Sequence, residues 1–330
     1  MATPFHHFME KIIDYAGLFP PAMLPMDEAI RNYAAYRQTN DEWMLSRYIC
    51  PAGRLGELKE YKDSLFAEGA PFKFSVLTSG GKNQKQFLEN LENDLIAISD
   101  FTKFHGEQVI VDALEARLPE NLVQAADPSS TARFLNKAAS LIERQGPPTL
   151  MAFYEAMFPK YWRNIVKAQI RGIAEHNRYI GGTRRFQRYQ PAGFKIRCGG
   201  VEAHMYPTTT QLAFVIANCR AQKVPLKATA GLHHPIRHFN AEAGVKMHGF
   251  MNVFGAGILA RVHDLELDDI LEIIEDEEAK NFIFTRRAFA WNTLRASMQD
   301  IEAARRENII SFGSCSFDEP REDLTNLKLL

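Results

Sequence analysis

The chain has 330 residues, of which 46% are hydrophobic and 24% are charged, and its formal net charge is −1 with the histidines neutral. These proportions are ordinary for a soluble globular protein. The near-neutral charge and the lack of a long basic run argue against nucleic-acid binding, and no run of about 18 apolar residues indicates a membrane span.

The four cysteines, Cys50, Cys198, Cys219 and Cys315, form no CxxC pair, so neither a zinc knuckle nor a redox pair is indicated. The first eleven residues lack the basic and apolar regions of a signal peptide. We therefore expect a cytoplasmic protein with reduced cysteines, and we expect Cys315 to be buried and inert.

Short β-like runs alternate with helical patterns along the chain. Two helical patterns, at 3–13 and 26–38, come first and form an N-terminal extension over residues 1–42. A Pro-Gly loop follows the first of them, in which Asp14 is expected to be a turn or helix-end residue. The eight β-like runs are 43–51, 72–78, 108–118, 149–155, 193–198, 225–229, 249–254 and 308–317.

The segments between these runs carry helical periodicity. Apolar residues from Phe87 to Phe101 fall on one helix face, and so do those from Leu212 to Cys219, with Thr208 placed to cap the start. The stretch 255–307 is long enough for two or three helices. Its aromatic residues could bury an interface between copies of the chain; they are Phe282, Phe284, Phe289 and Trp291.

Strands that alternate with helices pair in parallel, and eight of them favour closure into a barrel. An open doubly wound sheet usually carries a G-x-G-x-x-G turn, which is missing. The sequence therefore predicts an α/β fold: one (βα)8 TIM-type barrel domain over residues 1–330, with an N-terminal helical extension and an elaborated helical crossover at 255–307 before the last strand.

Active sites of such barrels lie at the carboxyl ends of the strands. On the fifth predicted strand, Lys195 and Arg197 alternate with apolar residues and would face the barrel axis. Buried cations need an anion or a partner. They would therefore form a clamp for a carboxylate or phosphate, or a structural salt-bridge layer with Glu115 and Glu155.

On the sixth predicted strand, Lys227 and Thr229 share the inward face. A lysine among cations in an apolar pocket tends to lose its proton, which makes Lys227 a candidate Schiff-base nucleophile. The alternatives are a third contact to the anion or a partner for Glu155. His233 and His234 follow in the next loop, where one could act as an acid or base.

Three segments together resemble a family of conserved bacterial proteins known only as uncharacterised. They are Asp14–Ala22 (DYAGLFPPA), Lys227–Pro235 (KATAGLHHP) and Gly313–Pro320 (GSCSFDEP). The match spans nearly the whole chain. The resemblance implies no activity.

A second, local resemblance joins Lys227-Ala-Thr-Ala-Gly to the K-T-S-T-G strand of deoxyribose-phosphate aldolase, a class I aldolase with a barrel fold. In that family the lysine forms the imine on the sixth strand, which implies the same role for Lys227. The family's second lysine, on the following strand, has no counterpart in 249–254, although Lys195 could serve.

These observations support three functions. The first is a lyase or aldolase that acts on a small anionic metabolite through an imine at Lys227, without a cofactor. Glu155 and His233 would move protons. The substrate-binding residues would be Lys195, Arg197, Thr229, Arg117, His234 and Asn252.

The second is a hydrolase or isomerase that uses a divalent metal ion, with Glu115, Glu155 and His233 or His234 at the metal. The third is a non-catalytic barrel that binds an anion or a partner protein. The small anionic metabolite is the expected ligand under the first function, and a homo-oligomer remains open under all three.

Overall fold

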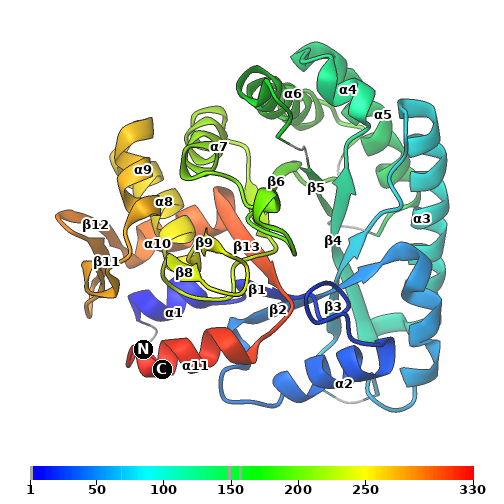
Figure 1. The fold of residues 1–330 in the computed structure, drawn as a ribbon. Coiled ribbons are helices and arrows are strands. Elements are labelled where there is room, and N and C mark those ends of the chain that lie inside the picture. The colour runs from blue at the N-terminus through cyan, green and yellow to red at the C-terminus, as the bar shows by residue number, and fades with distance from the viewer. Residues whose placement is uncertain (1–2, 68, 148–149, 156–157, 187) are drawn as a thin grey trace. The chain divides into compact units, whose positions relative to one another are not determined.

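A computed structural model describes residues 3–67, 69–147, 150–155, 158–186 and 188–330. Eight strands form a closed parallel barrel in the order β1-β13-β7-β6-β5-β4-β3-β2 (Figure 1). The predicted TIM-barrel fold is therefore confirmed. The barrel strands are β1 (Ile13–Tyr15), β2 (Leu45–Pro51), β3 (Phe72–Leu77), β4 (Val109–Arg117), β5 (Met151–Glu155), β6 (Gly193–Arg197), β7 (Leu226–Thr229) and β13 (Ile309–Ser314).

The helices occupy the segments between the strands, as their periodicity predicts. In α3 the apolar face from Phe87 to Phe101 is buried, and in α7 Thr208 forms a capping box with Gln211. The helices are α1 (Pro4–Met9), α2 (Met26–Tyr36), α3 (Gln84–His105), α4 (Glu120–Gln124), α5 (Pro128–Gln145), α6 (Trp162–Gly181), α7 (Thr209–Gln222), α8 (Phe250–His263), α9 (Leu267–Glu275), α10 (Met298–Glu307) and α11 (Asp318–Asn326).

The chain comprises two compact units. The first contains Met1–Leu24, Ala35–Ser46 and Ile196–Leu330, and the second contains Pro25–Ala34 and Arg47–Lys195. The first therefore holds β1, β7 and β13, and the second holds β3, β4 and β5. No helix within the described residues has the length and apolar character that a membrane span needs.

Two strand assignments made from the sequence are wrong. The run 249–254 is not a strand but the start of α8, and the eighth barrel strand is β1, which had been read as helix end and loop. A short apolar run does not separate a buried strand from a buried helix, and α8 is buried on every side over its first eleven residues. Lys227 therefore lies on the seventh barrel strand in chain order, not on the sixth.

The elaborated crossover also differs from the prediction, because it contains a sheet. Helices α8, α9 and α10 are present, but β10 (Phe282–Phe284), β11 (Ala288–Trp291) and β12 (Leu294–Ser297) form an antiparallel sheet beside them (Figure 1). Phe282, Phe289 and Trp291 are buried within the chain. The rings of Phe5 and Phe8 pack edge-on against Phe284. These aromatic residues thus serve the chain's own core, and a homo-oligomer stays a prediction.

Asn252, predicted to bind substrate, is instead a structural residue of α8. Its side chain is fully buried, accepts a hydrogen bond from the Arg237 backbone at 2.9 Å, and donates to the carbonyls of Ile273 and Asp276 at 2.8 Å each. The side chain thereby joins α8 to the chain before it and to the end of α9. All its hydrogen-bonding groups are used, which leaves none for a substrate.

Replacing Asn252 with alanine should therefore lower the free energy of unfolding by about 2–4 kcal/mol, because three buried hydrogen bonds are lost. Urea denaturation measures the change. The matched control is Asn218→Ala on α7, where a half-buried amide makes one bond to the Phe214 carbonyl and the cost should stay below about 1 kcal/mol. Equal effects of the two substitutions would contradict this role.

Candidate active site

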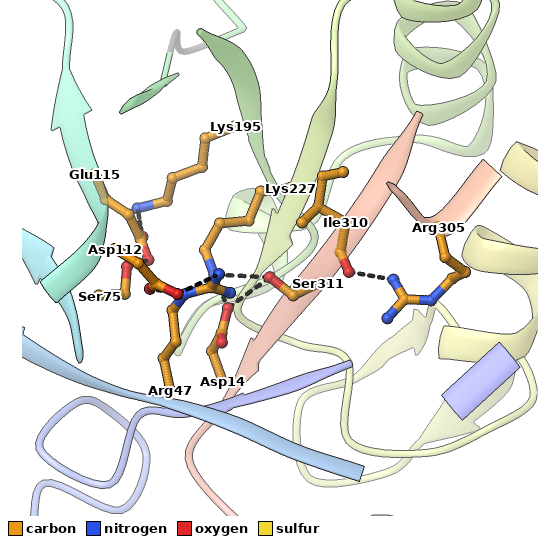
Figure 2. Close-up of polar contacts among 10 residues, drawn as sticks. All are labelled: Asp14, Arg47, Ser75, Asp112, Glu115, Lys195, Lys227, Arg305, Ile310 and Ser311. Carbon is orange, nitrogen blue, oxygen red and sulfur yellow. Dashed lines mark hydrogen bonds and ion pairs between the residues drawn. The ribbon is translucent and has the colours of Figure 1, made fainter. Parts of the chain in front are cut away.

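The first unit buries a lysine, an aspartate and a serine against one another. Lys227 on β7 forms an ion pair with Asp14 on β1, and both side chains are fully buried. Ser311 on β13 accepts a hydrogen bond from the Lys227 Nζ at 3.2 Å and donates one to the Asp14 carboxylate at 2.6 Å. Figure 2 shows the three side chains converging. Every charge in this group has a partner, as burial requires.

The pairing of three parallel strands brings this triad together. Asp14 lies opposite Gly313 of β13, and Gly313 lies opposite Thr229 of β7. The expectation that Asp14 is a turn or helix-end residue is thus wrong, because Asp14 lies on β1. The three residues of β1 are too few to show the alternation of a strand, although the segment from Asp14 to Pro21 is distinctive in composition.

Arg305 on α10 fixes the strand that carries Ser311. The register of β13 shifts between Ile309 and Phe312, and Arg305 donates hydrogen bonds to the carbonyls of Ile309 and Ile310 at this shift (Figure 2). It also donates to the carbonyls of Phe8, at 3.0 Å, and Glu10, at 2.9 Å. A single guanidinium therefore ties the end of α1 to the start of β13, the strand that carries Ser311.

The second unit buries a different lysine between two carboxylates. The Lys195 Nζ lies 2.7 Å from Glu115 and 3.1 Å from Glu155, and Ser75 donates a hydrogen bond to Glu115 at 2.7 Å. Burial alone would lower the pKa of Lys195, but the two carboxylates raise it above its ordinary value. Lys195 is therefore a persistent ammonium group, suited to electrostatic stabilisation and unsuited to nucleophilic attack.

A further ion pair lies on the same unit, where β4 bulges. Arg47 on β2 donates to the two carboxylate oxygens of Asp112, at 2.5 and 3.2 Å, and the register between β3 and β4 skips Asp112. A bidentate pair of this kind holds both side chains in fixed positions. Sequence reasoning missed Asp112 because the bulge, which the sequence does not show, changes the face on which it lies.

The predicted cations at the strand ends are exposed. Arg197 ends β6 and Arg117 ends β4, and within the described residues neither guanidinium has a hydrogen-bond or ion-pair partner. The prediction that Arg197 shares a buried environment with Lys195 is therefore wrong, because the strand ends at Arg197. The Cys198 backbone donates to the Thr229 carbonyl at 2.8 Å, which places Arg197 beside the end of β7.

The two histidines after β7 both face acids of α11. His233 Nδ1 lies 2.9 Å from Glu319, and His234 Nδ1 lies 2.6 Å from Asp323. Burial alone would lower the pKa of His233, but contacts with Cys315 and Glu319 raise it to about 9. The contact with His233 in turn lowers the pKa of Glu319. His233 is therefore an imidazolium at neutral pH.

The alternative metal site does not gather its predicted ligands into one group. Glu115 and Glu155 share the Lys195 ammonium, while His234 bonds to Asp323. Across the residues that the structure describes, no three side chains of the His, Cys, Asp or Glu type are placed to hold a metal ion together.

Comparisons with known proteins give a likeness of fold alone. No protein-family model matches the chain, and no curated protein matches it. Among solved structures, the chain is similar to a tetrameric deoxyribose phosphate aldolase from Aeropyrum pernix, with a TM-score of 0.44 and 12% identity over 70% of this chain and 80% of that chain. The family of uncharacterised bacterial proteins therefore stays a prediction, and the chemistry has to come from this chain's own residues.

Replacing Lys195 with methionine should lower the free energy of unfolding by about 3–5 kcal/mol, because Glu115 and Glu155 then face each other without a cation. Adding Glu155→Gln should recover part of the loss, since the two carboxylates no longer repel. Chemical denaturation of the single and double variants measures this coupling. If the double variant lost as much stability as the two single variants together, the three groups would not interact.

The His233–Glu319 pair should make stability depend on pH. The pKa of His233 rises from an ordinary 6.5 to about 9, so its contribution is complete below pH 6.5 and is lost as the pH rises through 9. Between these values the free energy of unfolding should fall by about 1–2 kcal/mol, a figure discounted for the half-exposed Glu319.

Urea denaturation at several pH values measures this slope in the unmodified protein and in two variants. His233→Gln should lose the slope between pH 6.5 and 9, and His234→Gln should keep it. A slope that survives in His233→Gln would assign the titration to another group.

Proposed function

We propose that this chain is a lyase of the aldolase kind, which binds a small anionic carbonyl compound as an imine on Lys227. The observation that carries this proposal is the buried Lys227–Asp14–Ser311 triad. A structural salt bridge needs only a charge partner. Here the lysine also has a hydroxyl within 3.2 Å, and that hydroxyl is itself bonded to the carboxylate, so a proton can move among three adjacent groups.

Imine formation uses these groups in order. Asp14 takes a proton from the Lys227 ammonium, and the free amine attacks the carbonyl carbon to form a carbinolamine. The hydroxyl of that adduct then receives a proton from Asp14 or Ser311 and leaves as water, while the C=N bond forms. Because the triad is buried, each proton transfer occurs in a medium of low dielectric constant, where fixed charges and dipoles act strongly.

The resulting iminium attracts electrons from the neighbouring carbon–carbon bond. As that bond breaks, the hydroxyl on the departing carbon gives its proton to Asp14 and an aldehyde is released. The remaining enamine takes up this proton at carbon and is hydrolysed to free Lys227. This sequence is the lyase direction, and its reverse is an aldol addition. Two carboxylates hold Lys195 in its charged form, so we assign the imine to Lys227.

The anionic part of the substrate would bind at the end of β6. Arg197 is exposed there, and the Cys198–Thr229 hydrogen bond places it beside the end of β7, two residues beyond Lys227. A guanidinium suits carboxylate and phosphate groups equally. His233 is an imidazolium near the same strand end. The part that His233 and Glu155 play in moving protons stays a prediction, as do the roles of Lys195, Arg117 and His234.

Borohydride trapping tests the proposal. The protein is incubated with pyruvate or dihydroxyacetone phosphate, reduced, and digested with trypsin. We expect the adduct mass on peptide 224–237, in which the modified Lys227 blocks cleavage. Lys227→Arg keeps a cation beside Asp14 and cannot form an imine, so it should give no adduct, and Asp14→Asn should slow trapping by roughly 10²-fold or more. Adducts confined to exposed lysines would contradict the proposal.

A non-catalytic anion-binding barrel is the competing outcome. Calorimetry with the same two compounds separates the functions, since Lys227→Arg should still bind an anion at Arg197, whereas Arg197→Gln should weaken binding by about tenfold or more. Binding without trapping in the unmodified protein would support the non-catalytic function.

A further inference from the structure

Cys315 differs from the other cysteines in its exposure. Cys50, Cys198 and Cys219 are buried, and burial raises the pKa of each thiol, to about 12 for Cys50 and Cys198. Cys315 follows β13 and is partly exposed, so the prediction that it is buried is wrong. All four are free thiols. Cys315 is therefore the cysteine that a reagent in solution can reach most readily.

The surroundings of Cys315 also differ from those of the other three. Its Sγ lies 3.9 Å from Nδ1 of His233, which is held in place by Glu319 at 2.9 Å. His233 carries a positive charge at neutral pH because its pKa is raised to about 9. A partly exposed sulfur beside a fixed cation is the setting in which reactive cysteines occur.

The geometry indicates a fixed cation rather than a catalytic relay. In a nucleophile–histidine–acid relay, the nucleophile and the acid contact opposite ring nitrogens, so that the ring passes a proton between them. Here Cys315 and Glu319 contact the same nitrogen, Nδ1. The N–H at Nδ1 therefore faces both the Cys315 sulfur and the Glu319 carboxylate. This arrangement holds the charged imidazolium ring beside the sulfur.

We propose that Cys315 is a site of oxidation by hydrogen peroxide. The Cys315 sulfur attacks one oxygen of the O–O bond. The S–O bond forms as the O–O bond breaks, and the sulfur loses two electrons. The leaving hydroxide takes a proton from the His233 imidazolium and departs as water, and the thiol proton replaces it on the ring. The product is a sulfenic acid. The buried positions of the other three cysteines leave it without an accessible partner for a disulfide.

Trapping with dimedone after exposure to hydrogen peroxide tests this inference. The adduct is located by mass spectrometry on the tryptic peptide 307–321, and its rate of formation is compared with that of glutathione at pH 7. We expect Cys315 to react at least tenfold faster than glutathione, and the buried cysteines to react little in the folded protein.

Three variants test the role of His233. His233→Gln should slow the reaction roughly tenfold, His233→Lys should restore part of the rate through its charge, and His234→Gln should leave it unchanged because His234 faces Asp323. Circular dichroism of each variant establishes that it is folded. A rate for Cys315 equal to that of glutathione, or one that His233→Gln does not alter, would overturn the inference. The readout is an adduct mass, so a failure here leaves the imine at Lys227 untouched.

Discussion

The buried ion pair between Lys227 and Asp14 is the interaction on which the first unit depends. Each partner lies on a different strand, both are fully buried, and Ser311 on a third strand completes the group. A buried charge without its partner costs several kcal/mol, so a shift in the register of β1, β13 or β7 that separates these side chains is disfavoured. The triad thus ties the pairing of the three strands to the candidate site.

The two buried lysines are in different electrostatic situations, and this difference separates their chemistry. Lys195 has two carboxylates, so its neighbours hold the proton on it. Lys227 contacts the Asp14 carboxylate and the Ser311 hydroxyl, which are bonded to each other, so its proton can pass to a neighbouring group in the proposed mechanism. The proposed function therefore gives the lysine of the second unit an electrostatic role and the lysine of the first unit a nucleophilic one.

The barrel and most of its strands follow from alternation and turn residues, because those patterns are local. Seven of the barrel strands were placed from the sequence, and Lys195 was correctly paired with Glu115 and Glu155 as one alternative. The missed features are of two kinds. Three-residue β1 is too short for a period, and α8 is buried all round and so has no polar face. Asp14, Ser311 and the β4 bulge at Asp112 depend on pairing between distant strands, which single-sequence patterns do not contain.

The contacts of β1 also determine when, during synthesis of the chain, this strand can reach its final position. Asp14 is synthesised before its partners, since Lys227 and Ser311 follow it by 213 and 297 residues. Until they are made, the nascent chain carries the Asp14 carboxylate without its cation. Since β1 pairs with β13, and Arg305 joins the end of α1 to β13, these contacts of β1 also wait for the segment 305–314. The triad therefore assembles only after about three hundred further residues have been made, and the Asp14 carboxylate has to remain solvated during that interval.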